Sequence, residues 1–179
     1  MATDAAAAPA LPALSYLRGY APALQAQAAA LLAAGRLRAS VLRRHPEPHG
    51  VRSERALYDY VSTLKAQYLR SAEPLAKVAW DPKLHIVHNA LGTHTAVSRV
   101  QGNKLKAKRE IRIAALFKQA PASFLRLIVV HELAHLKERE HGRAFYALCT
   151  HMEADYHPLE LDLRLWLTAL ELEPPPAAA

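Results

Sequence analysis

The sequence predicts an α+β fold in which helices come before and after a small antiparallel sheet. Residues 83–116 hold three short stretches with the period-two alternation of strands. The segments on either side carry apolar residues at the 3.6-residue spacing of helices. Because helical and strand-like segments are grouped along the chain, we expect the strands to form one sheet that packs on the helices.

Length and composition are those of a globular protein, with 179 residues, 51% of them apolar and 22% charged. A single cysteine, Cys149, cannot staple a secreted fold, so a reducing compartment is favoured. The N-terminus lacks the charged start of a secretory signal, and no stretch offers the roughly 20 apolar residues of a membrane span. We therefore expect a cytoplasmic protein without a membrane partner.

Four regions follow from the composition. Alanine and proline dominate the start and the end of the chain, which favours disorder there. Two prolines and a glycine in 45–50 mark a linker between an N-terminal helical part and the rest. We expect a disordered N-terminus (1–13), a helical extension (14–50), a main domain (51–172) and a disordered tail (173–179).

The elements of the main domain follow from capping and periodicity. Ser53 can cap a helix that carries apolar residues on one face. Gly102-Asn103 suits a hairpin turn, because both residues tolerate a positive φ angle. Pro158 suits the first turn of the last helix. The predicted strands are Lys83–Val87, Thr95–Val100 and Glu110–Leu116.

The motif that carries chemistry is His131-Glu132-Leu133-Ala134-His135. Histidines four residues apart lie on one face of a helix, so both imidazoles can bind one metal ion. Glu132 lies one step round the helix, where it can act as general base for a metal-bound water without being a ligand. HExxH arises by chance in roughly 3% of shuffled sequences of this composition, so we also weigh its context.

Catalytic zinc sites take three protein ligands and keep a fourth position open for water. His141 follows the motif beyond the expected helix end, and Gly142 after it favours a turn. We predict His141 as the third ligand of one Zn²⁺ per chain. Three imidazoles also suit other divalent transition metals.

Basic residues are in excess, with 23 Lys and Arg against 16 Asp and Glu. They concentrate in a segment just before the HExxH helix. Clustered cations suggest a polyanionic partner, either nucleic acid or nucleotide phosphate, although a solvated basic surface has the same composition. The candidate substrate-binding residues are Lys104, Lys106, Lys108, Arg109 and Arg112.

The stretch VVHELAHLKEREHGRAFYALCTHMEADYH, together with the upstream ALGTHTAVSRVQGNKLKAKREIRIA, resembles the YgjP-like metallopeptidase family. Around the metal motif the chain is also similar to the SprT, WLM and Spartan proteases. The resemblance implies a zincin-like fold, in which a small antiparallel sheet packs on the metal-bearing helix. It also implies that a peptide substrate pairs with a sheet edge, for which 112–116 is the candidate.

Three functions remain open from the sequence. The first is a zinc metallopeptidase with Glu132 as general base. The second is a metal-dependent nucleotide phosphohydrolase, for example a UTP pyrophosphatase, which holds phosphates with the basic segment 104–112. The third is a nucleic-acid-associated protease or binding protein. A P-loop mechanism is excluded, because the sequence has no Gly-rich loop followed by Lys-Ser or Lys-Thr.

Overall fold

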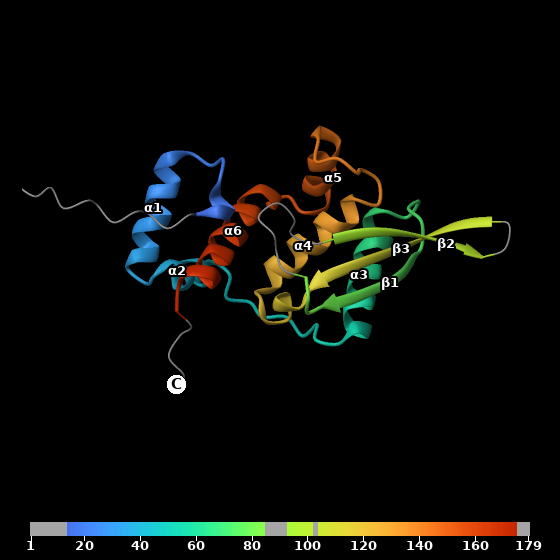
Figure 1. The fold of residues 1–179 in the computed structure, drawn as a ribbon, viewed down its shortest axis with the longest axis horizontal. Helices are drawn as coiled ribbons and strands as arrows, with labels where there is room; N and C mark the ends of the chain where they lie inside the picture. The colour runs from blue at the N-terminus through green and yellow to red at the C-terminus, as the bar shows by residue number, and fades with distance from the viewer. Residues whose placement is uncertain (1–13, 85–92, 102–103, 175–179) are drawn as a thin grey trace, which may run out of the picture.

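The computed structural model describes residues 14–84, 93–101 and 104–174, and its helices pack around a small sheet (Figure 1). The first part of the chain forms the 3-10 helix η1 (Ser15–Leu17) and the helices α1 (Pro22–Ala33), α2 (Leu37–Arg44) and α3 (Glu54–Tyr68). The middle part forms β1 (Leu75–Asp81), β2 (Thr93–Gln101), β3 (Lys104–Ala114) and the 3-10 helix η2 (Ala115–Gln119). The last part forms α4 (Ala122–Ala134), α5 (Arg143–Met152) and α6 (Tyr156–Leu172).

The sheet has the strand order β1-β3-β2 and is mixed. β2 and β3 pair antiparallel, as predicted, from Thr93 opposite Arg112 to Gln101 opposite Lys104. The first strand corrects two predictions. It pairs parallel to β3, and it runs over Leu75–Asp81, whereas Pro82 and Lys83 form a turn. The predicted turn residues 102–103 and positions 85–87 lie outside the described residues.

β3 is the central strand and not the edge that the sequence suggested. Its residues Arg109–Ala114 face β1 on one side, and its residues Lys104–Arg112 face β2 on the other. Residues 115–116 have left the sheet and belong to η2. Among the described strands, the two edge strands are therefore β1 and β2.

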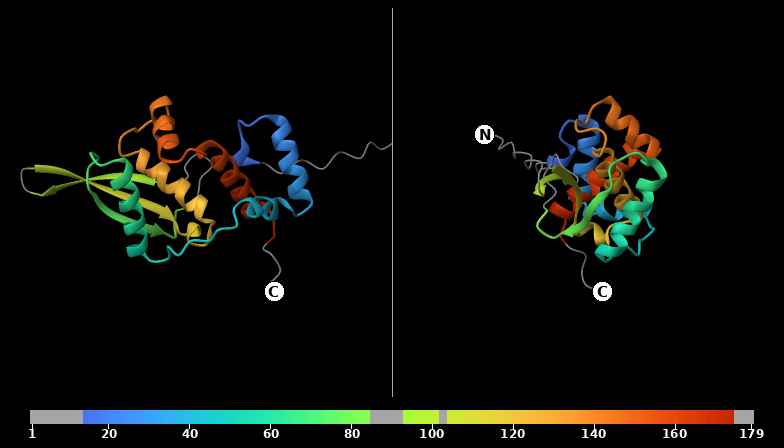
Figure 2. Two further views of the ribbon diagram at one scale, coloured as in Figure 1. Left: turned by 180° about the vertical axis from the view of Figure 1, so that it is seen from behind. Right: turned by 90° about the vertical axis from the view of Figure 1, so that its right-hand side faces the viewer.

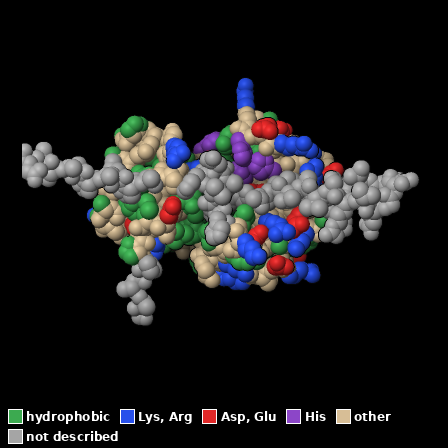
Figure 3. Space-filling model, in the orientation of Figure 1, with side chains coloured by type: hydrophobic (Ala, Val, Ile, Leu, Met, Phe, Trp, Pro, Cys, Tyr) green, Lys and Arg blue, Asp and Glu red, His purple; other side chains and the backbone are tan. Residues whose placement is uncertain are grey.

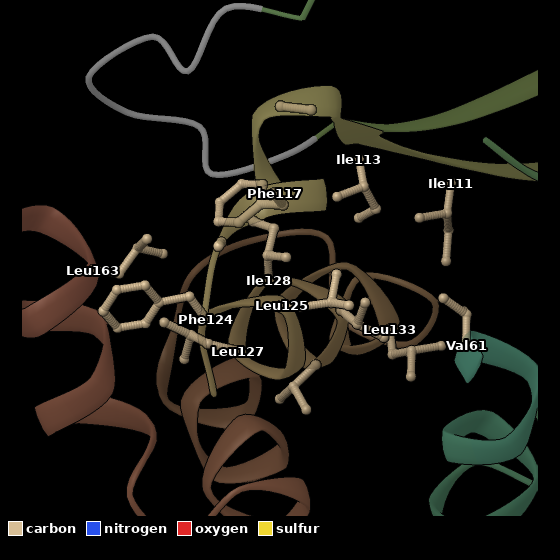
Figure 4. Packing of buried hydrophobic residues seen from close by; sticks show 14 of the residues in the cluster. Val61, Ile111, Ile113, Phe117, Phe124, Leu125, Leu127, Ile128, Leu133 and Leu163 are labelled. Atoms are coloured by element: carbon tan, nitrogen blue, oxygen red, sulfur yellow. The ribbon is translucent and has the colours of Figure 1, made fainter. Parts of the chain in front are cut away.

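Helix α4 lies under the sheet at the centre of the core. Its N-terminal three quarters are almost wholly apolar, and residues 127–134 are all buried. Figure 4 shows Ile111 and Ile113 of β3 pointing toward Leu125 and Ile128 of this helix. Burial on all sides fixes the axial rotation of α4, and with it the direction of the polar groups at its end.

The 3-10 helix η1 and the helices α1 and α2 pack on α6 and make an N-terminal lobe beside the sheet (Figure 2). Helix α2 is tied to the end of α6 through Glu173, whose carboxylate accepts hydrogen bonds from the backbone N–H groups of Leu37 and Arg38. Ser53 caps α3 by accepting from the N–H of Ala56, as predicted. None of the described helices is long and apolar enough to cross a membrane.

The last two helices, α5 and α6, each bury one face. Phe145, Cys149 and Met152 of α5 are buried, and burial raises the pKa of the Cys149 thiol to about 12. Helix α6 begins at Tyr156, two residues before Pro158, which still occupies its first turn. Leu170, near the end of α6, is 39% exposed.

Candidate active site

Three histidine side chains converge where α4 ends. His131 lies in the last turn of α4, His135 is its C-cap, and His141 lies in the turn that leads to α5. The Nε2 atom of His141 is 3.2 Å from Nε2 of His131 and 3.1 Å from Nε2 of His135. Figure 3 shows histidine side chains gathered on one face of the molecule. The structure thus brings together the three residues that the sequence selected.

The turn to His141 is short and ends at Gly142, the N-cap of α5. Backbone N–H groups of Leu136, Lys137 and Glu138 bond back to carbonyls of α4 and tighten its end. Gly142 has an extended backbone, with φ −92° and ψ −170°, so its position does not depend on a glycine-only conformation. What places His141 is the next helix, whose first turns pack under the histidines.

Phe145 forms the floor beneath the three imidazoles. Its ring centroid lies 5.0 Å from that of His131 and 4.7 Å from those of His135 and His141. Phe145 is itself fully buried. A rigid apolar floor restricts the rotamers of the imidazoles and lowers the local dielectric.

In His131 and His135 the other ring nitrogen, Nδ1, has a hydrogen-bond partner in the protein. Nδ1 of His135 donates to the carbonyl oxygen of Glu138 at 3.0 Å, which leaves the Nε2 lone pair toward the cluster. Nδ1 of His131 pairs with the hydroxyl of Tyr156 at 2.8 Å. Oriented imidazoles with outer hydrogen-bond partners are the usual arrangement of metal-binding histidines.

The electrostatics favour neutral imidazoles at His131 and His135. Burial, followed by the charges of His135, His141 and Arg164, lowers the pKa of His131 to about 3. Burial also lowers the pKa of His135. Ring nitrogens whose lone pairs face one another repel unless a cation lies among them.

The spacing of the nitrogens fits a metal ion. The ligand atoms of the three histidines all lie within 4.8 Å of one another. A tetrahedral ion about 2.0–2.1 Å from each nitrogen requires nitrogens roughly 3.3 Å apart, close to the observed Nε2 separations of 3.2 and 3.1 Å. Within the described part of the chain, no other three His, Cys, Asp or Glu side chains converge in this way.

Glu132 is a fully buried carboxylate next to the cluster. Neither of its oxygens has a hydrogen-bond partner among the described residues. Burial raises the pKa of Glu132 to about 8. A buried carboxyl without partners is costly in a folded protein, so it indicates that a cation or a polar ligand belongs beside it.

The described basic residues of the segment before α4 do not gather at the histidines. Arg112 lies on the sheet face opposite Ile111 and Ile113, where it pairs with Asp81 at 3.2 Å and Glu110 at 3.1 Å. Arg109 pairs with Glu73 at 2.9 Å. The side chains of Lys104, Lys106 and Lys108 lie outside the description.

The sequence did not point to two side chains that act on the cluster. Tyr156 contacts His131, and Arg164 acts on His131 electrostatically. Both lie on α6, eight residues apart, so they share one helical face. The helical spacing of these two residues can be predicted from the sequence, but the contact with a histidine 25 residues away cannot.

The comparisons with known proteins agree with this geometry. A family model described as "YgjP-like, metallopeptidase domain" matches residues 50–165. The chain belongs to the YgjP-like family. It is also 56% identical over 159 residues to a UTP pyrophosphatase of Escherichia coli (strain K12), covering 89% of this chain and 95% of that protein. No solved structure matches.

Membership of the YgjP-like family makes the chain a hydrolytic enzyme, since both descriptions are of hydrolases. Together with the histidine cluster, the family indicates a metal ion. The family model begins at residue 50, so the helices α1 and α2 lie outside it. The two descriptions differ in substrate, because one refers to peptides and the other to a nucleotide.

Proposed function

We propose that this protein is a metal-dependent hydrolase of nucleoside triphosphates, UTP in particular, that releases pyrophosphate. The observation that carries the proposal is the 56% identity to a UTP pyrophosphatase over 95% of that protein's length. Three convergent imidazoles beside a buried carboxyl support it, because hydrolysis of a phosphoanhydride needs an activated water and a proton acceptor.

The residues divide the work as follows. His131, His135 and His141 would hold the metal, and three imidazoles with an open fourth position suit zinc best. Such an ion supplies Lewis-acid chemistry by lowering the pKa of a water and polarising a phosphoryl oxygen. Its charge would also bring down the raised pKa of Glu132, so that this side chain is ionised as a base.

The reaction balances with one water. The water oxygen bonds to the α-phosphorus, the bond from that phosphorus to the α,β-bridging oxygen breaks, and the products are UMP and pyrophosphate. Glu132 takes a proton from the attacking water and can return it to the leaving pyrophosphate oxygen. Tyr156 and the Glu138 carbonyl keep the imidazoles in place through this exchange.

A metallopeptidase is the second candidate, favoured by the description of the family model. The same residues can direct water at an amide carbon. Because β3 is central, an extended peptide would pair with the edge of β2 or β1 and not with residues 112–116. Variants that block pairing at the edge of β1 or β2, and assays on a panel of peptides, therefore test the metallopeptidase alone.

The test compares wild type with Glu132→Gln on UTP, the other nucleoside triphosphates and an unfolded protein substrate. We expect wild type to release UMP and pyrophosphate, and Glu132→Gln to keep about one metal per chain while kcat falls by about 10²–10⁴. Glu54→Gln, which changes an exposed carboxylate at the start of α3, is the matched control. Cleavage of the protein substrate without release of pyrophosphate would replace the proposal by the second candidate.

A further inference from the structure

The outer hydrogen-bond partner of His131 differs in kind from that of His135. Nδ1 of His135 bonds to the backbone carbonyl of Glu138, a group that can only accept. Nδ1 of His131 lies 2.8 Å from the hydroxyl of Tyr156, and a hydroxyl can both accept and donate. The direction of the bond between His131 and Tyr156 therefore depends on where the proton of each partner goes.

A metal ion in the cluster sets this direction. A neutral imidazole carries one proton, on one of its two nitrogens. Nε2 of His131 lies 3.2 Å from Nε2 of His141, on the side of the cluster. When this Nε2 binds a metal, the proton of the ring is on Nδ1, so Nδ1 donates and the hydroxyl oxygen of Tyr156 accepts. The hydroxyl proton of Tyr156 then needs an acceptor of its own.

Cys149 supplies this acceptor. The side chains of Tyr156 and Cys149 hydrogen-bond to each other. Both residues are fully buried, so the pair is shielded from water. A thiol sulfur is a weak acceptor, but a buried hydroxyl proton without any acceptor would be costly. A chain of hydrogen bonds thus runs from His131 through Tyr156 to the sulfur of Cys149.

Helix α5 places Cys149 by its periodicity. Phe145 and Cys149 are four residues apart, so they lie on one face of the helix, and both are buried. The ring centroid of Phe145 lies 5.0 Å from that of His131. One turn further along the same face, Cys149 bonds to Tyr156. Helix α5 therefore supports His131 twice, through an apolar floor and through a sulfur that bonds to its outer partner.

A separate link fixes the backbone of Tyr156. Tyr156 is the first residue of α6, and its N–H donates to the carbonyl oxygen of Glu153 at 3.0 Å. The Glu153 carboxylate pairs with Arg126 of α4, which also donates to the carbonyl oxygen of Met152 at 2.8 Å. The turn between α5 and α6 is thereby tied to the helix that carries His131. Because these links do not involve the phenol, removal of the hydroxyl alone should leave the fold in place.

We propose that Tyr156 and Cys149 are positioning residues for the metal centre. The Tyr156 hydroxyl accepts from Nδ1 of His131 and donates to the sulfur of Cys149, so the pair holds His131 in the tautomer and orientation in which Nε2 binds the metal. The proposal rests on the metal-holding part of the proposed function and not on the identity of the substrate. It gives the single cysteine of the chain a role beyond packing.

Zinc affinity tests the role of Tyr156. Titration of the metal-free protein with zinc, in competition with a chelating indicator, compares wild type with Tyr156→Phe, which keeps the buried ring and removes only the hydroxyl. We expect the affinity to fall about ten- to a hundredfold, because Nδ1 of His131 loses its acceptor. Tyr146→Phe is the matched control. Its ring centroid lies 6.2 Å from that of Tyr156, and zinc affinity should stay within twofold of wild type.

Two substitutions test the role of the sulfur. Cys149→Ala removes the acceptor and should weaken zinc binding severalfold, whereas Cys149→Ser offers a hydroxyl oxygen and should recover most of the affinity. If Cys149 only fills space, both variants lose stability and bind zinc as wild type does, which would overturn its part in the proposal. The same pair tests the hydrogen-bond chain if Tyr156→Phe does not fold.

The outcomes separate this proposal from the proposed function. Zinc affinity of Tyr156→Phe within twofold of that of Tyr146→Phe would overturn the positioning role, whether or not UTP is hydrolysed. Weaker zinc binding in Tyr156→Phe, in a protein that does not hydrolyse UTP, would support the positioning role and contradict the proposed function. If UTP is the substrate, added zinc should restore most of the turnover of Tyr156→Phe but not that of Glu132→Gln, because only Glu132→Gln lacks the proton acceptor.

Discussion

Histidine and other polar side chains lie at both ends of α4, and the two groups differ in whether they have hydrogen-bond partners. At the N-terminal end Oγ of Ser123 lies 2.9 Å from Nδ1 of His45, and Nε2 of His45 lies 2.8 Å from Asp162. Arg44 donates two further hydrogen bonds to Asp162, at 2.6 and 3.0 Å. At the C-terminal end Nε2 of His141 lies 3.2 Å from Nε2 of His131 and 3.1 Å from Nε2 of His135, and the Glu132 carboxyl has no hydrogen-bond partner among the described residues.

The comparison teaches that residue types alone do not identify a catalytic site. Ser123, His45 and Asp162 are the types found in a hydrolytic triad, yet Arg44 holds the carboxylate by two bonds and the His45 ring packs on Phe124. This network joins α2, α4 and α6 and satisfies its own polar groups. The groups left unsatisfied at the other end indicate where a ligand binds.

The largest effect is expected at the histidine end, from the loss of one ligand. His141→Ala should weaken metal binding by at least about 100-fold, because two imidazoles cannot close a site built for three. Titration of the metal-free protein with zinc measures it. His151→Ala is the matched control, since His151 is exposed and packs against Tyr68. Unchanged zinc affinity in His141→Ala would place the third ligand elsewhere.

The next effect concerns the stability of the metal-free protein between pH 6.5 and pH 8. Burial raises the pKa of Glu132 from 4.5 to about 8, so the folded protein keeps a proton that the unfolded chain has released. Stability therefore falls as pH rises through this window, by roughly 2 kcal/mol. The lowered pKa of His131 has the opposite effect on stability, and this effect is largest below the unfolded pKa of 6.5.

Urea titrations of chelator-treated protein at pH 6.5 and 8 measure this slope. Glu132→Gln carries no titrating carboxyl at this position, so its unfolding free energy should change much less over the same window. A wild type as stable at pH 8 as at pH 6.5 would contradict the buried, unpaired state of Glu132. The same comparison with bound zinc should show a smaller slope, because the cation favours the ionised carboxyl.

A smaller effect is expected at the satisfied end of α4. Burial raises the pKa of Asp162, but hydrogen bonds from Arg44 and His45 outweigh it and leave the pKa below its ordinary value. The stability that this carboxylate contributes is present above the unfolded pKa and is lost as pH falls through the lower folded pKa. Asp162→Asn should cost about 1 kcal/mol at neutral pH and leave zinc affinity unchanged. A loss of zinc binding would show that the two ends are coupled.

The difference between the two ends also explains how far the sequence could predict the site. His131, Glu132 and His135 are fixed by one helix, whose periodicity is local, and His141 follows after a short turn. The contact of His131 with Tyr156 spans 25 residues and that of Arg164 with Tyr16 spans 148, so each depends on how separate helices pack. No local pattern contains such pairs.

The sheet shows the same limit. β2 and β3 are adjacent in the chain and alternate, so their antiparallel pairing was predicted. β1 does not alternate, because Val78, Ala79 and Trp80 are consecutive buried residues. The sequence therefore predicted a strand at 83–87, where apolar and polar residues alternate more regularly. Its parallel pairing with β3 is non-local, and it makes the expected edge strand the central one.

The smallest effect is expected on the sheet face opposite α4. Lys77, Glu110, Arg112 and Asp81 form a row of alternating charges there, with Arg112 bonded to both carboxylates. Because these carboxylates already neutralise Arg112, Arg112→Gln should leave KM for UTP within twofold of wild type. Exposed ion pairs contribute little to stability, so the unfolding free energy should also change little. If Arg112→Gln raised KM for UTP by about tenfold or more, the triphosphate would extend over this face of β3, and the basic segment chosen from the sequence would hold the phosphates after all.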